Sequence, residues 1–333
     1  MSGDARYHVL IALLSAATLA LFSLSLTVGP AGIAFADSLA ALFSAKGDGV
    51  ALIMQEIRLP RALLGLMIGA TLGLSGAVLQ GYLRNPLAEP GLLGISAMAS
   101  LGAVLSIYTG LAAAFMLALP LAALAGAVLA VVVVQAMAGG RANALLIILA
   151  GIAVSSFAGA MTSLALNLSP NPFAALEIMF WMLGSLTDRS MTHVWLAAPF
   201  ILAGWAMLGS LGRPLDALTL GPETAASMGV DMRRVQLLAV FGTAACVGAG
   251  TAVSGAIGFV GLVVPHILRP LVGARPSRLL LASALGGACV VLAADVLVRL
   301  IAPGRDLKLG VLTAIVGAPF FLWLVFRARR KLV

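Results

Sequence analysis

Apolar residues fill this chain in long runs, and charged residues interrupt those runs mainly at their ends. The runs are rich in Leu, Ala and Gly, and they lack the alternation of apolar and polar positions that marks the strands of a membrane barrel. A helix of about 20 apolar residues crosses the hydrocarbon core of a bilayer. The pattern predicts ten such helices, near residues 8–28, 61–82, 92–108, 112–137, 144–166, 192–211, 236–253, 256–271, 279–300 and 309–327.

The composition agrees with an all-α membrane protein. Of the 333 residues, 62% are hydrophobic and 10% are charged, whereas about 25% of the residues in soluble domains are charged. A soluble fold of this composition would expose a large apolar surface and aggregate. We therefore expect one membrane-embedded domain over residues 1–333.

The positive charges predict the orientation in the membrane. If the N-terminus lies inside, ten spans place the C-terminus inside as well. Thirteen Lys and Arg residues then lie inside and seven outside, as the positive-inside rule requires. The basic residues are scattered over span ends, so the net charge of +8 indicates contact with lipid and not with nucleic acid.

The first apolar run, Val9 to Val28, is longer than the apolar region of a cleaved signal peptide, which has about 7–15 residues. We favour an uncleaved first span, although the stretch Ala34-Phe35-Ala36 resembles a cleavage site and leaves cleavage as the alternative. Two further stretches, Ile33–Phe43 and Phe173–Leu183, are expected to lie along the outer membrane surface.

The largest inner loop, residues 212–235, predicts two short helices, Pro214–Leu218 and Pro222–Met228. A Pro at the start of a helix and a Gly just past its end, here Gly229, follow the usual asymmetry of helix ends. Such a loop is either a simple connector or a docking surface for a soluble partner.

Small residues recur every four positions in the second predicted span, at Gly65, Gly69, Gly73, Ala77 and Gly81. This spacing places them on one face of a helix and lets another backbone approach closely. We expect this span to be central and tightly packed.

The chain lacks the motifs of an energy-converting or catalytic protein. It has no G-x-x-x-x-G-K-[ST] loop for ATP, and no convergent set of acid, base and nucleophile that an enzyme needs. Its three histidines, His8, His193 and His266, fall in different parts of the chain, so we expect no metal site.

An ion-coupled transporter needs ionisable groups at membrane depth. The best candidate is Asp295, but Arg299 follows one helical turn later and can pair with it. We interpret Asp295 as a structural partner of Arg299, and we expect another subunit to supply the energy. An ion-coupled secondary transporter remains the alternative.

Several strings together carry a family resemblance. The strings are Arg58–Arg61, Gly76–Gln80, Asn85–Gly94, Gly255–Arg269 and Gly317–Trp323. With these strings the chain resembles the FecCD-type permeases of ATP-binding-cassette (ABC) importers, which import vitamin B12, haem and ferric siderophores.

The resemblance implies a homodimer of ten-helix subunits in the bacterial inner membrane. It also implies two cytoplasmic ATPases, which use ATP and Mg²⁺, and a periplasmic substrate-binding protein, while the chain itself binds no cofactor. The cargo is expected to be an iron chelate, with haem first and a ferric siderophore second. Cobalamin is the alternative within the family.

The resemblance also assigns the outer arginines Arg58, Arg61 and Arg299 to docking of the binding protein. The planar guanidinium group binds carboxylates in a bidentate manner, which suits this role. Ordinary snorkelling of arginines to the membrane interface is the alternative.

Two inner constrictions are implied as gates. The first consists of Asn85, Pro86 and Leu87. The second, at the start of the fifth span, falls on Asn143, Ala144 and Leu145, where this sequence is more apolar than some relatives.

The inner loop matches the coupling helices of the family, which contact the ATPase. The residues implied in this contact are Gly221, Pro222, Glu223, Ala225, Ala226, Ser227, Met228 and Gly229.

Overall fold

The computed structural model describes residues 3–29, 32–44, 49–139, 144–169, 171–301 and 307–329, and these residues form helices and loops without a strand. Some of the Lys and Arg residues that were counted to predict the orientation, and one predicted gate residue, lie outside the described ranges. These are Lys46, Arg141, Asn143, Arg305, Arg330 and Lys331.

Seven helical segments in the described part of the chain are long and apolar enough to cross a membrane. They are α1 (Gly3–Thr27), Gly49–Tyr82 (comprising α3, Gly49–Leu52, η1, Ile53–Arg58, and α4, Leu59–Tyr82), α7 (Ala118–Ala138), α8 (Ala144–Asn167), α10 (Met191–Gly209), α13 (Met232–Ser254) and α15 (Pro276–Ile301). Three more helices overlap the other predicted spans: α5 (Ile95–Tyr108), α14 (Val260–Leu268) and α16 (Leu309–Arg329).

The remaining elements are short and lie between the long helices. They are α2 (Phe35–Ala41), η2 (Pro90–Leu93), α6 (Leu111–Ala114), α9 (Pro172–Met182), α11 (Gly212–Leu218), α12 (Pro222–Ser227) and η3 (Arg269–Val272).

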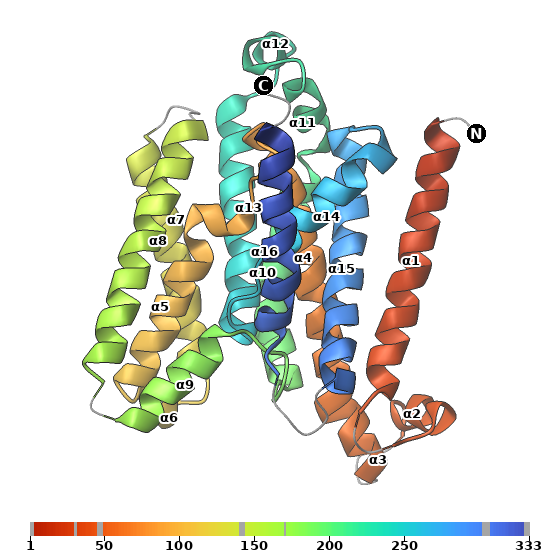
Figure 1. Ribbon diagram of the computed structural model, residues 1–333, viewed down its shortest axis with the longest axis vertical. Coiled ribbons are helices and arrows are strands. Elements are labelled where there is room, and N and C mark those ends of the chain that lie inside the picture. The colour runs from red at the N-terminus through yellow and green to blue at the C-terminus, as the bar shows by residue number, and fades with distance from the viewer. Residues whose placement is uncertain are drawn as a thin grey trace.

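The two ends of the helix bundle differ in what they carry (Figure 1). The N-terminus, the C-terminus, α11 and α12 lie at one end, which we call the inner end. The elements α2, α3, α6 and α9 lie at the opposite end, which we call the outer end. This arrangement agrees with the orientation predicted from the basic residues.

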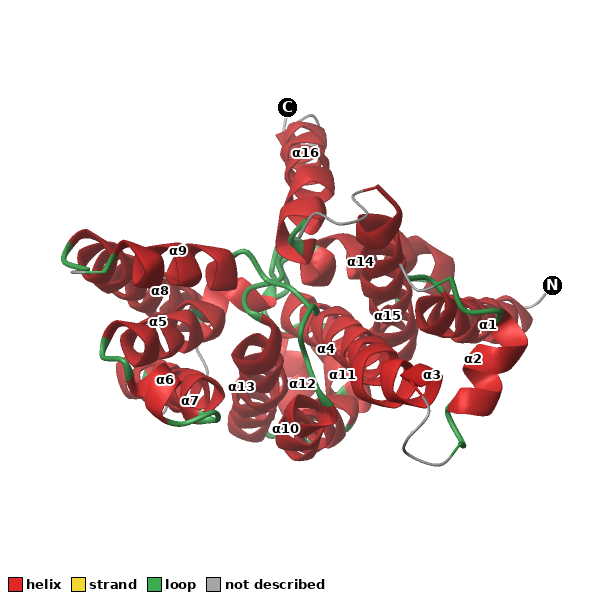
Figure 2. Ribbon diagram, turned by 90° about the horizontal axis from the view of Figure 1, so that it is seen from below, coloured by secondary structure: helices red, strands yellow, loops and turns green. Residues whose placement is uncertain are grey.

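The helix α4 runs through the centre of the bundle, with α13 and α15 beside it (Figure 2). Its glycines are the reason for the close fit: a Cβ added at Gly73 would lie 1.9 Å from the Ser283 carbonyl oxygen of α15, and one at Gly69 would lie 2.4 Å from that of Gly287. Only Gly permits backbones to approach so closely. The predicted packing role of the small-residue face is confirmed.

The helix α14 is shorter than predicted. Its nine residues rise only about 14 Å, which is less than half of the hydrocarbon core. The reason is the preceding segment Gly255–Gly258, which is not helical, with Gly255 in the left-handed region at φ +74°. The expected span at 256–271 is thus a loop, a short helix and the 3-10 turn η3.

Candidate functional site

The outer end of α4 carries the sequence Arg58-Leu59-Pro60-Arg61. Pro60 has no N–H to donate to the carbonyl four residues earlier, and the preceding residues form η1, a π-helix. Here the N–H of Leu59 bonds to the carbonyl of Met54, five residues back. Single π turns are frequent at functional sites. Around this turn, Arg58 and Arg61 reach different neighbours.

Arg58 reaches the C-terminal end of α1. Its Nη1 donates to the carbonyl oxygens of Leu26 and Thr27, at 2.9 Å each, and the residue is only 4% exposed. The last carbonyls of a helix lack partners within the helix, and a cation there complements the helix dipole. Arg58 therefore caps α1. Its docking role stays a prediction, and it would require Arg58 to leave these carbonyls.

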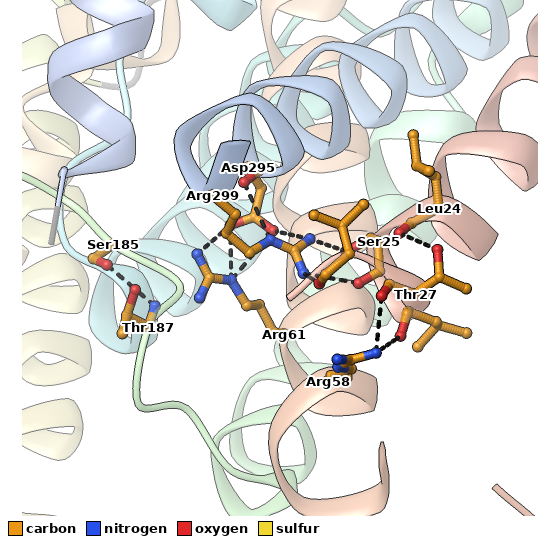
Figure 3. A network of polar contacts seen from close by, with 11 residues as sticks. Leu24, Ser25, Thr27, Arg58, Arg61, Ser185, Thr187, Asp295 and Arg299 are labelled. Carbon is orange, nitrogen blue, oxygen red and sulfur yellow. Dashed lines mark hydrogen bonds and ion pairs between the residues drawn. The ribbon is translucent and has the colours of Figure 1, made fainter. Parts of the chain in front are cut away.

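Asp295 holds the other two arginines (Figure 3). Arg61 donates from Nε to Oδ1 at 2.9 Å and to Oδ2 at 3.2 Å, and its Nη2 lies 2.9 Å from Oδ1 as an ion pair. Arg299 donates from Nη2 to Oδ2 at 2.8 Å. Arg299 also donates to the carbonyl oxygens of Ser25 and Val28, at 2.8 and 2.7 Å. The predicted pairing of Asp295 with Arg299 is confirmed. The bond to Arg61 across helices is an addition that sequence spacing did not indicate.

The outer cluster, defined as Arg58, Arg61, Asp295 and Arg299, carries three guanidinium groups and one carboxylate. Burying charge is costly unless each group is paired and hydrogen-bonded, and here every guanidinium has carbonyl or carboxylate acceptors. The cluster keeps an excess of positive charge at the outer end. Chemically it is suited to an approaching carboxylate.

The predicted first gate lies beside a cavity of about 690 Å³ at the inner end. The side chain of Asn85 accepts a hydrogen bond from the N–H of Leu87 at 2.9 Å, which fixes the turn around Pro86. The cavity is lined by Asn85, Pro86, Leu87, His266, Ile267, Arg269, Pro270, Ala274, Phe320, Trp323 and Leu324.

The predicted second gate is separate from this cavity within one chain. Ala144 and Leu145 begin α8 and are not among the residues that line the cavity, while Asn143 lies outside the described residues. The gating roles of both segments stay predictions.

A buried polar contact near the first gate was missed by sequence reasoning. The Oε1 of Gln80 accepts a hydrogen bond from Nη2 of Arg269 at 2.7 Å. The Nε2 of Gln80 donates to the carbonyl oxygens of Gly261 and Leu262, at 3.4 and 3.3 Å. The available signal was one Gln and one Arg within apolar runs, which indicates a polar contact but not the identity of the partner.

The predicted coupling segment forms a surface at the inner end. Both expected short helices exist, as α11 and α12. Asp216 of α11 accepts a hydrogen bond from the N–H of Ser277 at 2.8 Å, which ties the segment to the start of α15. Ala225 is buried and Gly221 is half-buried. The other predicted coupling residues, Pro222, Glu223, Ala226, Ser227, Met228 and Gly229, are exposed.

Comparison with known proteins identifies the family. The sequence model of the FecCD transport family matches residues 17–327, which include the outer cluster, the first gate and the coupling segment. The chain belongs to the FecCD transport family. The resemblance seen in the sequence is thereby confirmed.

Individual relatives of this FecCD-family chain are similar over nearly their whole length. The hemin transport system permease protein HmuU of Yersinia pestis is 36% identical over 301 residues, covering 86% of this chain and 87% of the relative. The vitamin B12 import system permease protein BtuC of Citrobacter koseri is 38% identical over 309 residues, covering 92% and 91%.

A solved structure has the same fold as this FecCD-family chain. It is described as an inward-facing conformation of a metal-chelate type ABC transporter, and it matches with a TM-score of 0.84 and 30% identity, covering 95% of this chain and 98% of the other. The chain is accordingly an all-α, multi-pass permease of an ABC importer in the bacterial inner membrane.

Proposed function

We propose that this permease carries an iron chelate from the periplasm to the cytoplasm by alternating access, with haem as the first candidate and a ferric siderophore as the second. The chain binds no cofactor itself, and two cytoplasmic ATPases that bind ATP and Mg²⁺ supply the energy. The observation that carries the proposal is the 36% identity to a hemin permease over 86% of the chain.

The arrangement of charged and exposed residues supports this assignment of partners. The outer cluster presents excess positive charge at one end, where a binding protein with surface carboxylates would dock. The exposed residues of α12 lie at the opposite end, where an ATPase would bind (Figure 1). The helix α15 joins the two, because its start bonds to Asp216 and Asp295 lies near its outer end.

A second copy of the chain completes the transport path in this proposal. The helix α16 stands away from the rest of the bundle (Figure 2) and carries exposed apolar residues such as Ile315 and Val316. The cavity beside the first gate, here called the gate cavity, is lined in part by residues of α16. A partner copy that packs on α16 would place two gate cavities on either side of a common axis.

The outer cluster argues against the ion-coupled alternative. A proton carrier must release and accept a proton at membrane depth. The carboxylate of Asp295 is instead held by two guanidinium groups at 2.8 to 2.9 Å, and it is 1% exposed, so it has no open path along which to exchange a proton with solvent. This contact therefore favours transport that is powered by partner ATPases.

Cobalamin is a second candidate cargo, because a vitamin B12 permease is 38% identical to this chain. The two cargoes can be separated by reconstituting the permease with its ATPase and its binding protein in liposomes. ATP is enclosed in the liposomes, so that the liposome interior corresponds to the cytoplasm. Uptake of haem, a ferric siderophore and cyanocobalamin into the interior is then measured. ATP-dependent uptake of haem supports the proposal, and uptake of cyanocobalamin alone would refute it.

A further inference from the structure

The three arginines of the outer cluster differ in how many of their donors remain available. Arg299 uses all of its nitrogens: Nε bonds to the Asp295 carbonyl, Nη1 to α1 carbonyls, and Nη2 to Asp295 and Ser25 Oγ. Arg58 is buried against α1, and its Nη2 is sealed from solvent. Neither can bind a new partner without breaking contacts within the chain.

Arg61 is different. Its Nε donates to both oxygens of Asp295 and its Nη2 forms an ion pair with the same carboxylate, but its Nη1 meets no acceptor among the described residues. Its side chain is also the most exposed of the three, at 15% against 11% for Arg299. Arg61 thus offers Nη1 as a free donor, whose direction is set by the contacts that Nε and Nη2 of the same guanidinium make with Asp295.

Asp295 is itself fixed from two sides. It is 1% exposed, it projects from the tightly packed helix α15, and Arg299 anchors its second oxygen at 2.8 Å. A carboxylate held in this way cannot follow a moving guanidinium. Asp295 therefore restricts Arg61 to one orientation.

We propose that Asp295 is a positioning residue for docking: it orients Arg61 so that the free Nη1 donates to a carboxylate of the binding protein. This inference rests on the proposed function. Arg58 and Arg299 serve chiefly to hold the C-terminal end of α1, and Arg61 carries most of the docking energy. Preorganised donors bind more tightly because less conformational entropy is lost on binding.

The inference predicts a distinctive kinetic effect of Asp295→Asn. The substitution removes one negative charge, so the outer end becomes more positive and encounter with an acidic partner is not slowed. The orientation of Arg61 is lost, so the complex dissociates faster. We expect an unchanged or higher association rate and a dissociation rate raised about tenfold, the size of one well-placed charged hydrogen bond.

The test uses the permease with its ATPase in nanodiscs and the haem-loaded binding protein in solution. Association and dissociation rates are measured by biolayer interferometry for wild type, Asp295→Asn, Arg61→Gln and the double variant. Asp188→Asn is the matched control, because it removes the same charge from an exposed outer position and has no hydrogen bond or ion pair to the outer cluster. It should leave the dissociation rate unchanged.

The double variant separates positioning from general structural support. If Asp295 acts through Arg61, adding Asp295→Asn to Arg61→Gln accelerates dissociation no further, because the oriented donor is already absent. A further acceleration in the double variant would overturn the inference and assign Asp295 a structural role.

The remaining outcomes are also decisive. If Arg61→Gln alone dissociates like wild type, docking at Arg61 is wrong, and the proposed partner surface fails together with this inference. If Arg61→Gln dissociates faster but Asp295→Asn does not, docking stands and only the positioning role of Asp295 is overturned.

Discussion

Replacing Gly73 with Ala should destabilise the permease strongly, because the added methyl group would collide with the backbone of α15 and not with a side chain that can move. The added Cβ would lie 1.9 Å from the carbonyl oxygen of Ser283 and 2.7 Å from its carbonyl carbon. Cβ atoms essentially never come closer than 3.0 Å to another atom, so α4 and α15 would have to separate by about 1.1 Å in a close-packed interior. No side-chain rotation can relieve this contact.

The expected magnitude follows from overpacking, which costs about 1–3 kcal/mol. A rigid backbone obstacle places Gly73→Ala at the upper end, about 3 kcal/mol. For a chain of this size, that corresponds to a fall of about 5 °C in the unfolding temperature. The assay is thermal unfolding of the purified permease in detergent, followed by intrinsic tryptophan fluorescence.

Two matched glycines serve as controls for this prediction. Gly65 lies on the same face of α4, but its added Cβ would meet the flexible ends of two side chains, Leu292 at 3.1 Å and Leu186 at 3.4 Å, and no backbone atom. At Gly159 of α8, no atom from elsewhere in the described part of the chain lies within 4 Å of an added Cβ. Ala at either position should leave the unfolding temperature within about 2 °C of wild type. Equal unfolding temperatures for Gly73→Ala and wild type would refute the close packing of α4 on α15.

Three further predictions concern the inner and outer ends. Replacing residues 223–229 with a Gly-Ser segment should abolish ATP-dependent uptake while the unfolding temperature stays near that of wild type, and intact uptake would contradict the coupling role. Gln80→Leu should lower stability by about 1–3 kcal/mol in thermal unfolding, since Arg269 loses its 2.7 Å acceptor; an unchanged transition would show that this bond contributes nothing. Ser25→Ala removes one Arg299 acceptor but leaves two carbonyls, so the free energy of unfolding should fall by less than about 1.5 kcal/mol. A larger fall in thermal unfolding would contradict the capping of α1 that Arg299 shares with Arg58.

The sequence predicted the fold well where the signal is local. Hydropathy located the spanning helices, since each apolar run is about as long as the membrane is thick. The spacing of Gly65, Gly69 and Gly73 indicated the packed face of α4, because helical periodicity alone places small residues on one side. Pro222 and Gly229 similarly bracketed α12, since both residues act on the local backbone.

The sequence failed where the cause lies in distant contacts. The short helix α14 was expected as a full span, because Gly255–Gly258 is as apolar as its surroundings and hydropathy does not register a left-handed Gly. The pairing of Asp295 with Arg61 joins residues 234 positions apart, whereas spacing shows only the neighbour Arg299. Arg58 is buried because it contacts the C-terminal end of α1, and the sequence does not show that these two segments meet.

The central claim is that this chain is a conduit whose transport is powered by partner ATPases. It is tested most directly by measuring haem uptake into liposomes that contain the permease alone, the permease with its ATPase, or both with the binding protein. We predict accumulation only in the complete system with ATP, and none in the permease alone under a proton or sodium gradient. Accumulation by the permease alone under an ion gradient would contradict the account.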